Sequence, residues 1–271
     1  MSLLGGRVAI LIEKEWLELR RRRVILASVI VLPLALLATT FVFTFLLPGL
    51  IGDSFYEDPS LDRALAKLAL DPELAVIGPG GLFEVLLLRQ FLILLLIVPV
   101  GIGISIATYS VVGEKVTRSL EPLLATPITT AELLWGKTLA AAIPAVAVTW
   151  ATFAVFAAGV ALWGQPGVFS LVMNGPACLV VALIAPLVAI LGLSLGILVS
   201  SRVNDPRTAQ QVSVIVILPL VALSVSQLKG LLSLTAPVVL LAVAVLALAD
   251  LLVVRVGVVF FERERILTRW K

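Results

Sequence analysis

The stretch from Val24 to Leu47, VILASVIVLPLALLATTFVFTFLL, runs for 24 positions without a charged residue. A helix needs about 20 apolar residues to cross the hydrocarbon of a bilayer, so this stretch is long enough to span one. Further apolar runs follow it along the chain: Val85 to Val111, Thr138 to Trp163, Leu171 to Val199, Val212 to Gln227 and Ala236 to Phe261. They lack the regular alternation of apolar and polar residues that is typical of β-barrel strands. The sequence therefore predicts an all-α membrane protein, with six transmembrane helices in one domain covering residues 1–271.

The composition supports a membrane protein over a soluble one. The chain is 61% hydrophobic and 14% charged, whereas soluble domains are about 45–50% apolar and about 25% charged. Its formal net charge of +3 does not indicate nucleic-acid binding, because the basic residues fall where anionic lipid headgroups are expected.

The distribution of Lys and Arg predicts the orientation. With six spans, the N-terminus, the second and fourth loops and the C-terminus share one side, and that side carries 16 of the 20 basic residues. Loops rich in Lys and Arg are retained in the cytoplasm. The long segment on the other side, Pro48 to Glu84, is acidic and forms the predicted outer loop 48–84. We therefore expect both the N and C termini to be cytoplasmic.

Residues 7–23, before the first span, have the pattern of an amphipathic helix. Apolar residues recur at helical spacing at Val8, Ile12, Trp16 and Leu19. Charged residues occupy the remaining positions, namely Glu13, Lys14, Glu15 and Glu18. Such a helix, with a Trp and a basic end, is expected to lie in the membrane interface; the alternative is that it continues the first span into the cytoplasm.

The outer loop contains a second amphipathic pattern. Asp58 is a good N-cap, and Pro59 suits the first helical position. Leu61, Leu65 and Leu68 then fall on one face before Asp71 and Pro72 end the pattern. We expect a short helix on the outer surface.

Residues that carry catalysis are scarce. The chain has no His, and its single cysteine, Cys178, lies in an apolar run, so the usual general base and any thiolate metal cluster are missing. The sequence Trp135-Gly136-Lys137-Thr138 is superficially similar to a phosphate-binding loop, but Ala131 stands where that motif needs a glycine. We therefore expect no enzyme activity and no metal or cofactor in this chain.

Charges inside apolar runs are candidates for function, because burying them in a membrane is unfavourable. Asp250 lies within the last run and is a candidate intramembrane functional residue, either as an ion ligand or as an anchor between helices. Arg255 follows five residues later, about 140° around a helix, so the two are not expected to face each other. Glu84 and Arg89, near the outer end of the second span, are expected to snorkel towards the headgroups.

Small residues and prolines interrupt the spans. Gly192, Gly196 and Ser200 form a small-xxx-small ridge along which another helix can approach closely. Pro99, Pro144, Pro186 and Pro219 fall inside predicted spans and allow kinks. These patterns predict close helix contacts without saying which helices make them.

The loop from Val112 to Lys137, VGEKVTRSLEPLLATPITTAELLWGK, is a polar island between the second and third apolar runs. Glu114, Arg118 and Glu121 form a charged row at helical spacing. Pro122 and Pro127 prevent a continuous helix. Thr129 and Glu132 form a capping box that predicts the start of the third membrane helix. The loop is thus expected to be a short amphipathic piece held between two helix ends.

This loop resembles the loop signature of ABC-2 type permeases, the membrane subunits of ABC exporters. The similarity rests on EK at 114–115, SLEPLLATPIT at 119–129 and LWGK at 134–137, with a looser match in SSRVNDPRTAQQ at 200–211. It extends to the whole topology, from the N-terminal helix to the sixth span. The chain has little room between the fifth and sixth spans, Gln227 to Thr235, for the re-entrant helices of related exporters.

The resemblance implies a permease in the plasma (cytoplasmic) membrane, working as a dimer with a second copy or a paralogue. A separate ATP-binding cassette ATPase subunit would bind ATP and Mg, and the cytoplasmic coupling loop 112–137 would seat on it. The residues that the resemblance places at that interface are Glu114, Lys115, Thr117, Arg118, Leu120, Glu121, Pro122, Leu123, Leu124, Thr126 and Pro127. The alternatives are a non-transporting membrane scaffold and an ion-coupled secondary transporter, although the latter usually needs internal repeats or several midplane charges.

Overall fold

The computed structural model describes residues 2–21, 23–52, 59–70, 74, 77–116, 129–202, 208, 211, 214–228 and 234–260 of the chain. Every regular element within these residues is helical, which confirms the all-α prediction for them. The elements that the following description uses are α1 (Ser2–Arg21), α2 (Arg23–Phe41), η1 (Val42–Leu46), α3 (Leu47–Ile51), α4 (Pro59–Leu68), α5 (Pro79–Leu95), α6 (Ile97–Val116), α8 (Thr130–Trp163), α9 (Val168–Val172), α10 (Gly175–Leu179), η3 (Val180–Ile184), α11 (Ala185–Arg202), η4 (Val214–Ile217), α13 (Leu218–Leu228) and α14 (Ala236–Phe260).

Five helices of the described chain are long and apolar enough to cross a membrane. They cover Val29–Ile51, Pro79–Ala107, Trp135–Trp163, Gly175–Val199 and Ala236–Val256. The predicted fifth span corresponds to the shorter apolar helix Ile215–Leu228. At 1.5 Å per residue this helix is about 21 Å long, less than the hydrocarbon thickness of about 30 Å.

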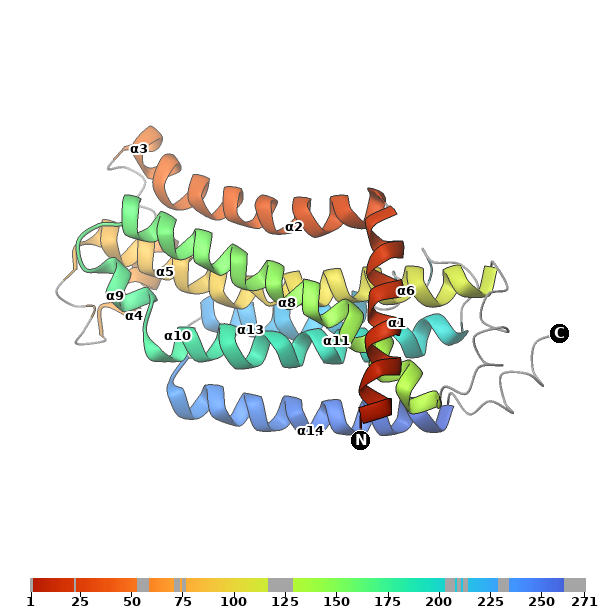
Figure 1. Ribbon diagram of the computed structural model, residues 1–271. Coiled ribbons are helices and arrows are strands. Elements are labelled where there is room, and N and C mark those ends of the chain that lie inside the picture. Colours follow the sequence, from red (N-terminus) through yellow and green to blue (C-terminus); the bar gives the residue numbers. More distant parts are fainter. Residues whose placement is uncertain are drawn as a thin grey trace.

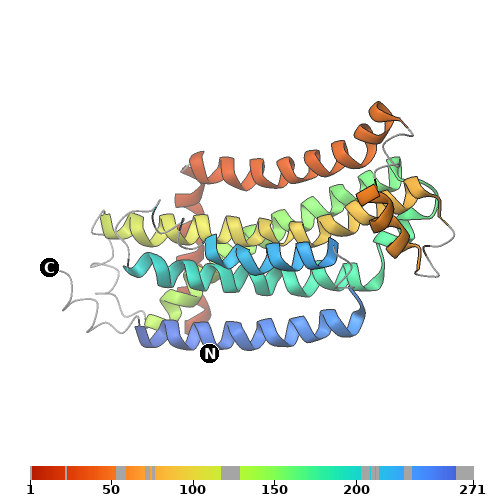
Figure 2. The same ribbon diagram turned by 180° about the vertical axis from the view of Figure 1, so that it is seen from behind.

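The long helices lie roughly side by side in one bundle, and α1 crosses one end of it at a steep angle (Figure 1). In both views α2 and α14 lie at opposite edges, and α13 lies on the face away from α8 (Figure 2). Because α6 ends and α8 begins at the end that α1 crosses, we call this the loop end of the bundle. The opposite end carries α4.

A stack of aromatic rings joins α2, α5 and α8. The ring of Phe156 stacks against those of Phe91, at a centroid distance of 4.2 Å, and Phe41, at 6.2 Å. Gly159, one turn further along α8, leaves room for the Phe41 ring, since a Cβ atom there would lie 2.3 Å from its Cζ. The three helices therefore pack around one buried aromatic centre.

The predicted small-residue ridge packs against α6. A Cβ atom on Gly192 would lie 3.2 Å from Val100 Cγ1, and one on Gly196 would lie 3.3 Å from Ala107 Cβ. On the facing helix, a Cβ atom on Gly103 would lie 2.9 Å from Leu193 Cγ. The prediction of a close helix contact is confirmed, and its partner is α6 of the same chain.

Prolines mark the irregular turns of the bundle. The π-helical segment η1 immediately precedes α3, whose first turn contains Pro48, and η3 immediately precedes α11, whose first turn contains Pro186. A proline lacks the N–H donor and crowds the preceding turn, so wider turns before it are expected. The second span is interrupted at Leu96, between α5 and α6, three residues before Pro99.

The outer amphipathic helix is present as α4, and its leucine face is packed inside the protein. Leu65 is buried in the main hydrophobic cluster, and Leu61 and Leu68 pack against that cluster. One boundary differs from the prediction, because α5 begins at Pro79 and not at Val85. Gly78 and Pro79 start the helix, so Glu84 belongs to α5 and not to the loop 48–84.

Candidate functional site

The cytoplasmic coupling loop predicted from the sequence is bounded by two helix ends. Glu114 and Lys115 lie in the last turn of α6, which ends at Val116, and α8 begins at Thr130. The other predicted interface residues lie outside the described residues: Thr117, Arg118, Leu120, Glu121, Pro122, Leu123, Leu124, Thr126 and Pro127. The structure therefore describes the two helix ends that flank this loop, and we call them the base of the loop.

The capping box that was predicted at the start of α8 is confirmed. The Glu132 N–H donates to Thr129 Oγ1 at 3.2 Å, and the Thr129 N–H donates to Glu132 Oε2 at 2.7 Å. The Glu132 side chain is buried. These reciprocal bonds satisfy two donors of the first turn, so α8 has a defined beginning directly after the loop.

A buried ion pair joins α1 to the first turns of α8. Lys137 Nζ lies 2.9 Å from Glu15 Oε1, and the two side chains are only 6% and 4% exposed. Lys14 Nζ also lies 3.7 Å from the same carboxylate. Attraction between opposite charges is stronger away from water, and such a pair is sensitive to the loss of either partner. Glu15, predicted to be on the polar side of α1, is thus part of its packed face.

Two further contacts accompany the ion pair. The Trp16 indole N–H donates to the carbonyl of Ala140 at 2.8 Å. In a regular helix this carbonyl would accept from residue 144, which here is Pro144 and has no N–H. Trp16 therefore satisfies an acceptor that the proline leaves free, and the helix continues through Pro144.

Leu11 fills the space above Gly136. A Cβ atom on Gly136 would lie 2.4 Å from Leu11 Cδ2, so a larger residue at 136 would require the Leu11 side chain to shift. We call the three contacts, Leu11 with Gly136, Glu15 with Lys137 and Trp16 with Ala140, the α1–α8 clamp. The apolar stripe of α1 is centred on Leu11, which is buried, whereas Val8, Ile12 and Leu19 are partly buried and Trp16 is 38% exposed.

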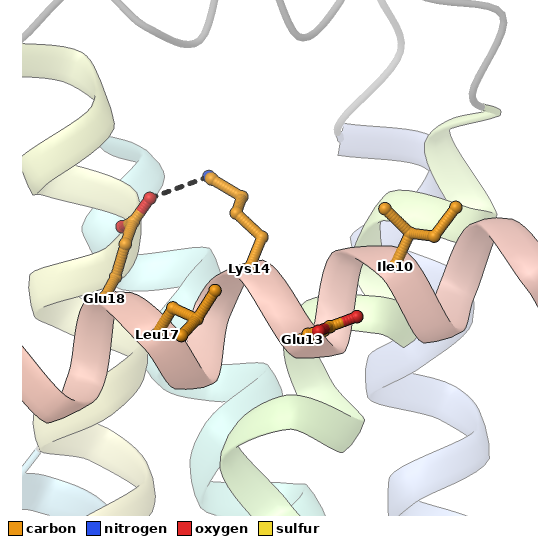
Figure 3. Close-up of a pocket in the computed structure, with 5 residues that line it drawn as sticks. All are labelled: Ile10, Glu13, Lys14, Leu17 and Glu18. Carbon is orange, nitrogen blue, oxygen red and sulfur yellow. Dashed lines mark ion pairs between the residues drawn. The ribbon is translucent and has the colours of Figure 1, made fainter.

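The outward face of α1 differs from the packed face. Ile10, Glu13, Lys14, Leu17 and Glu18 line a shallow groove there (Figure 3). Lys14 Nζ and Glu18 Oε1 lie 3.3 Å apart across one helical turn. Exposed pairs of this kind add little stability, so the packing of α1 depends on the clamp and not on this face.

Asp250 is buried in α14, with 7% of its surface exposed. Within the described part of the chain, neither carboxylate oxygen has a hydrogen-bond partner. Arg255 is exposed, as expected for two residues on different sides of the helix. Asp250 is therefore an inward-facing acid.

The polar residues near the start of the second span turn inward, so the prediction that they snorkel is wrong. Glu84 is buried and accepts from the backbone N–H of Gln165 at 2.9 Å. Arg89 Nη2 donates to the carbonyl of Leu171 at 3.1 Å. Their partners lie just beyond α8 and in α9, so both side chains bond to backbone groups of the protein itself.

The same region of α5 is tied to α13 by amide side chains. Gln90 Nε2 donates to the carbonyl of Ser224 at 3.2 Å and makes a short contact with its hydroxyl. Gln227 Nε2 donates to the carbonyl of Arg89 at 3.4 Å. The sequence analysis did not predict these contacts. The pattern that could have indicated them is the presence of two amide side chains, Gln90 and Gln227, in otherwise apolar runs.

Long apolar helices packed in a single bundle define this chain as a multi-pass membrane protein. The family model described as ABC-2 family transporter protein matches residues 9–251. The chain therefore belongs to the ABC-2 transporter family, and the predicted resemblance is confirmed. Members of this family are membrane components of ABC transporters, so the chain is an ABC transporter permease. No curated protein matches the chain.

Proposed function

We propose that this chain is the membrane-spanning permease subunit of an ATP-binding cassette exporter, driven by a separate ATP-binding subunit that holds ATP and Mg. The ATPase would seat on the coupling loop 112–137. The observation that carries this proposal is the base of that loop: α8 starts at a complete capping box and is held to α1 by the buried Glu15–Lys137 pair. A force applied to the loop would therefore act on a rigid helix end.

The topology that suits this function has six spans and both termini in the cytoplasm. The short helix Ile215–Leu228 would be the fifth span, completed by neighbouring helices. Its hydrogen bonds to α5 support this assignment, because they join one side of it to the bundle. The orientation is supported by the 16 of 20 basic residues that the six-span topology assigns to the side of the N-terminus. In this orientation α1 lies along the cytoplasmic interface of the plasma membrane, with exposed Ile10 and Leu17 available to lipid.

The permease would work as a dimer with a second copy or a paralogue. The described faces of α2 and α14 expose many large apolar side chains at opposite edges of the bundle. Lipid would cover most of these faces, and the second subunit would cover part of them. The transport pathway would then lie between the two permease subunits.

Copurification tests the partnership. The chain, expressed together with an ATP-binding subunit encoded beside it, should retain that subunit through affinity purification in detergent. If the two proteins do not associate when both are folded, the proposed ATPase partnership is contradicted, and a non-transporting role becomes the better assignment.

Reversing a charge of the loop tests the coupling assignment. Glu121→Arg should lower ATP hydrolysis by the complex about fivefold or more, because Glu121 belongs to the charged row of the loop. The thermal unfolding of the permease should hardly change, since surface substitutions have small effects. Asp62→Arg, a charge reversal in the predicted outer loop, is the matched control. Unchanged hydrolysis and transport in Glu121→Arg would contradict the role of this loop.

A further inference from the structure

We propose that the α1–α8 clamp makes α1 and the first turns of α8 move as one body, and that α1 thereby carries the motion of the coupling loop to α2. Glu15, Trp16 and Lys137 are positioning residues in this view. The inference rests on the proposed function, because it assumes that an ATPase moves the loop. It adds a second route by which that motion reaches the membrane helices.

The ion pair holds the two helices in one register. Glu15 and Lys137 are separated by 122 positions in the chain, and both side chains are almost fully buried. Sliding or lifting α1 would separate these two buried charges. The loss of one partner from such a buried pair is strongly unfavourable. The clamp therefore resists relative movement of α1 and α8.

The contact between Trp16 and Ala140 adds a second point of attachment one turn further along α8. Because Pro144 leaves the Ala140 carbonyl without its helical donor, detaching α1 would leave a polar group of α8 unpaired. The close approach of Leu11 to Gly136 adds a third point. Three contacts within residues 11–16 thus attach the middle of α1 to the first turns of α8.

The other end of α1 leads directly to the first membrane helix. α1 ends at Arg21, α2 begins at Arg23, and α1 crosses the end of the bundle between α8 and the start of α2 (Figure 1). With a single residue between the two helices, a rotation of α1 displaces the beginning of α2. Loop motion thus reaches α8 directly and α2 through α1.

A disulfide across the clamp tests whether the two helices move together. A Cβ atom on Gly136 would lie 3.4 Å from Leu11 Cβ, close to the spacing of about 3.5–4.5 Å in disulfides. The variant L11C/G136C, in a Cys178→Ser background, should form this bond and hydrolyse ATP equally well in its oxidised and reduced forms. If oxidation stops hydrolysis in the purified complex and reduction restores it, α1 and α8 move relative to each other and the proposal is overturned.

Charge reversal tests whether the clamp transmits motion. Glu15→Lys places two cations together, so kcat for ATP hydrolysis by the complex should fall about fivefold or more while KM for ATP stays unchanged. The swapped variant E15K/K137E restores an ion pair of opposite charges, so its kcat should return towards that of the unaltered complex. The oxidised L11C/G136C disulfide should likewise restore kcat when it is combined with E15K. Lys67→Gln, at an exposed lysine of α4, is the control.

Spin labels report the motion itself. In the Cys178→Ser background, Leu34→Cys on α2 and Leu248→Cys on α14 provide two exposed thiols. The helices α2 and α14 lie at opposite edges of the bundle (Figure 1). ATP binding should change the distance between their labels, and E15K should abolish that change. An equal change in E15K would overturn the proposal even if ATPase association is intact. Loss of copurification in the unaltered chain would instead remove the proposed function.

Discussion

Two tryptophans of the bundle complete hydrogen bonds that prolines leave open. Trp16 donates to Ala140, whose helical donor would be Pro144, and Trp150 Nε1 donates to the carbonyl of Val181 at 3.0 Å. Val181 lies in the π-helical turn η3, where the donor five residues later is Pro186. An indole N–H brings a donor on a large apolar side chain, which suits a site inside a membrane protein. Both prolines are thus tolerated without an unpaired carbonyl.

Asp250, unlike these carbonyls, is a buried acceptor with no hydrogen-bond partner among the described residues. Replacing it tests how much the unpaired carboxylate lowers the stability of the protein. Asp250→Asn should raise the free energy of unfolding by about 1 kcal/mol or more, because a neutral amide is less unfavourable to bury without a partner than a carboxylate. Thermal unfolding of the purified protein in detergent measures this change. Glu13→Gln, an exposed carboxyl of α1, should leave the unfolding temperature unchanged. A lower stability of Asp250→Asn would show that the carboxylate gains a partner in the assembled protein.

The contact between α6 and α11 depends on small residues in both helices. Gly103, Gly192 and Gly196 bring the two backbones close together. Ser194, which lies between the two glycines of α11 in the sequence, is also buried. Apolar burial does not drive helices together in lipid, because lipid is apolar too, so tight packing of this kind supplies the attraction.

Enlarging one of these glycines should separate the helices. Gly103→Val introduces a Cβ atom 2.9 Å from Leu193 Cγ, and overpacking of this kind costs about 1–3 kcal/mol. Gly49→Val in α3, where nothing lies within 4 Å of the added atom, is the control for replacing a helical glycine. Gly103→Val should therefore unfold at a lower temperature than Gly49→Val. Equal unfolding temperatures would contradict the close packing of α6 and α11.

Features that depend on neighbouring residues could be predicted from the sequence, whereas contacts between distant segments could not. The box of Thr129 and Glu132 and the helix after Pro59 follow from short patterns, and the structure contains both. The Glu15–Lys137 pair joins positions 122 apart, so its geometry exists only once α1 folds across α8. The start of α5 at Pro79 is not evident from the sequence, because Glu84 separates residues 79–83 from the apolar run that begins at Val85.

At the scale of the molecule, orientation is the property with the clearest test. In a Cys178→Ser background, Leu70→Cys, just after α4, and Glu13→Cys, on α1, place single thiols at exposed positions. The helices α4 and α1 lie at opposite ends of the bundle (Figure 1). A membrane-impermeant maleimide should label Leu70→Cys on intact cells, and Glu13→Cys only after the membrane is permeabilised. The reverse pattern would contradict the predicted cytoplasmic side.

The unbroken length of α8 connects the loop end of the bundle to the end that carries α4 (Figure 1). Its 34 residues make a rod of about 51 Å, against a hydrocarbon thickness of about 30 Å. One end begins at the Thr129 cap, and just beyond the other end Gln165 donates to Glu84. If this rod tilts by about 10° around its middle, each end moves by about 4 Å in opposite directions. A small displacement of the helix end beside the loop would then move the residues next to Glu84 in the opposite direction. This motion would need no other element, because both ends belong to one rigid helix.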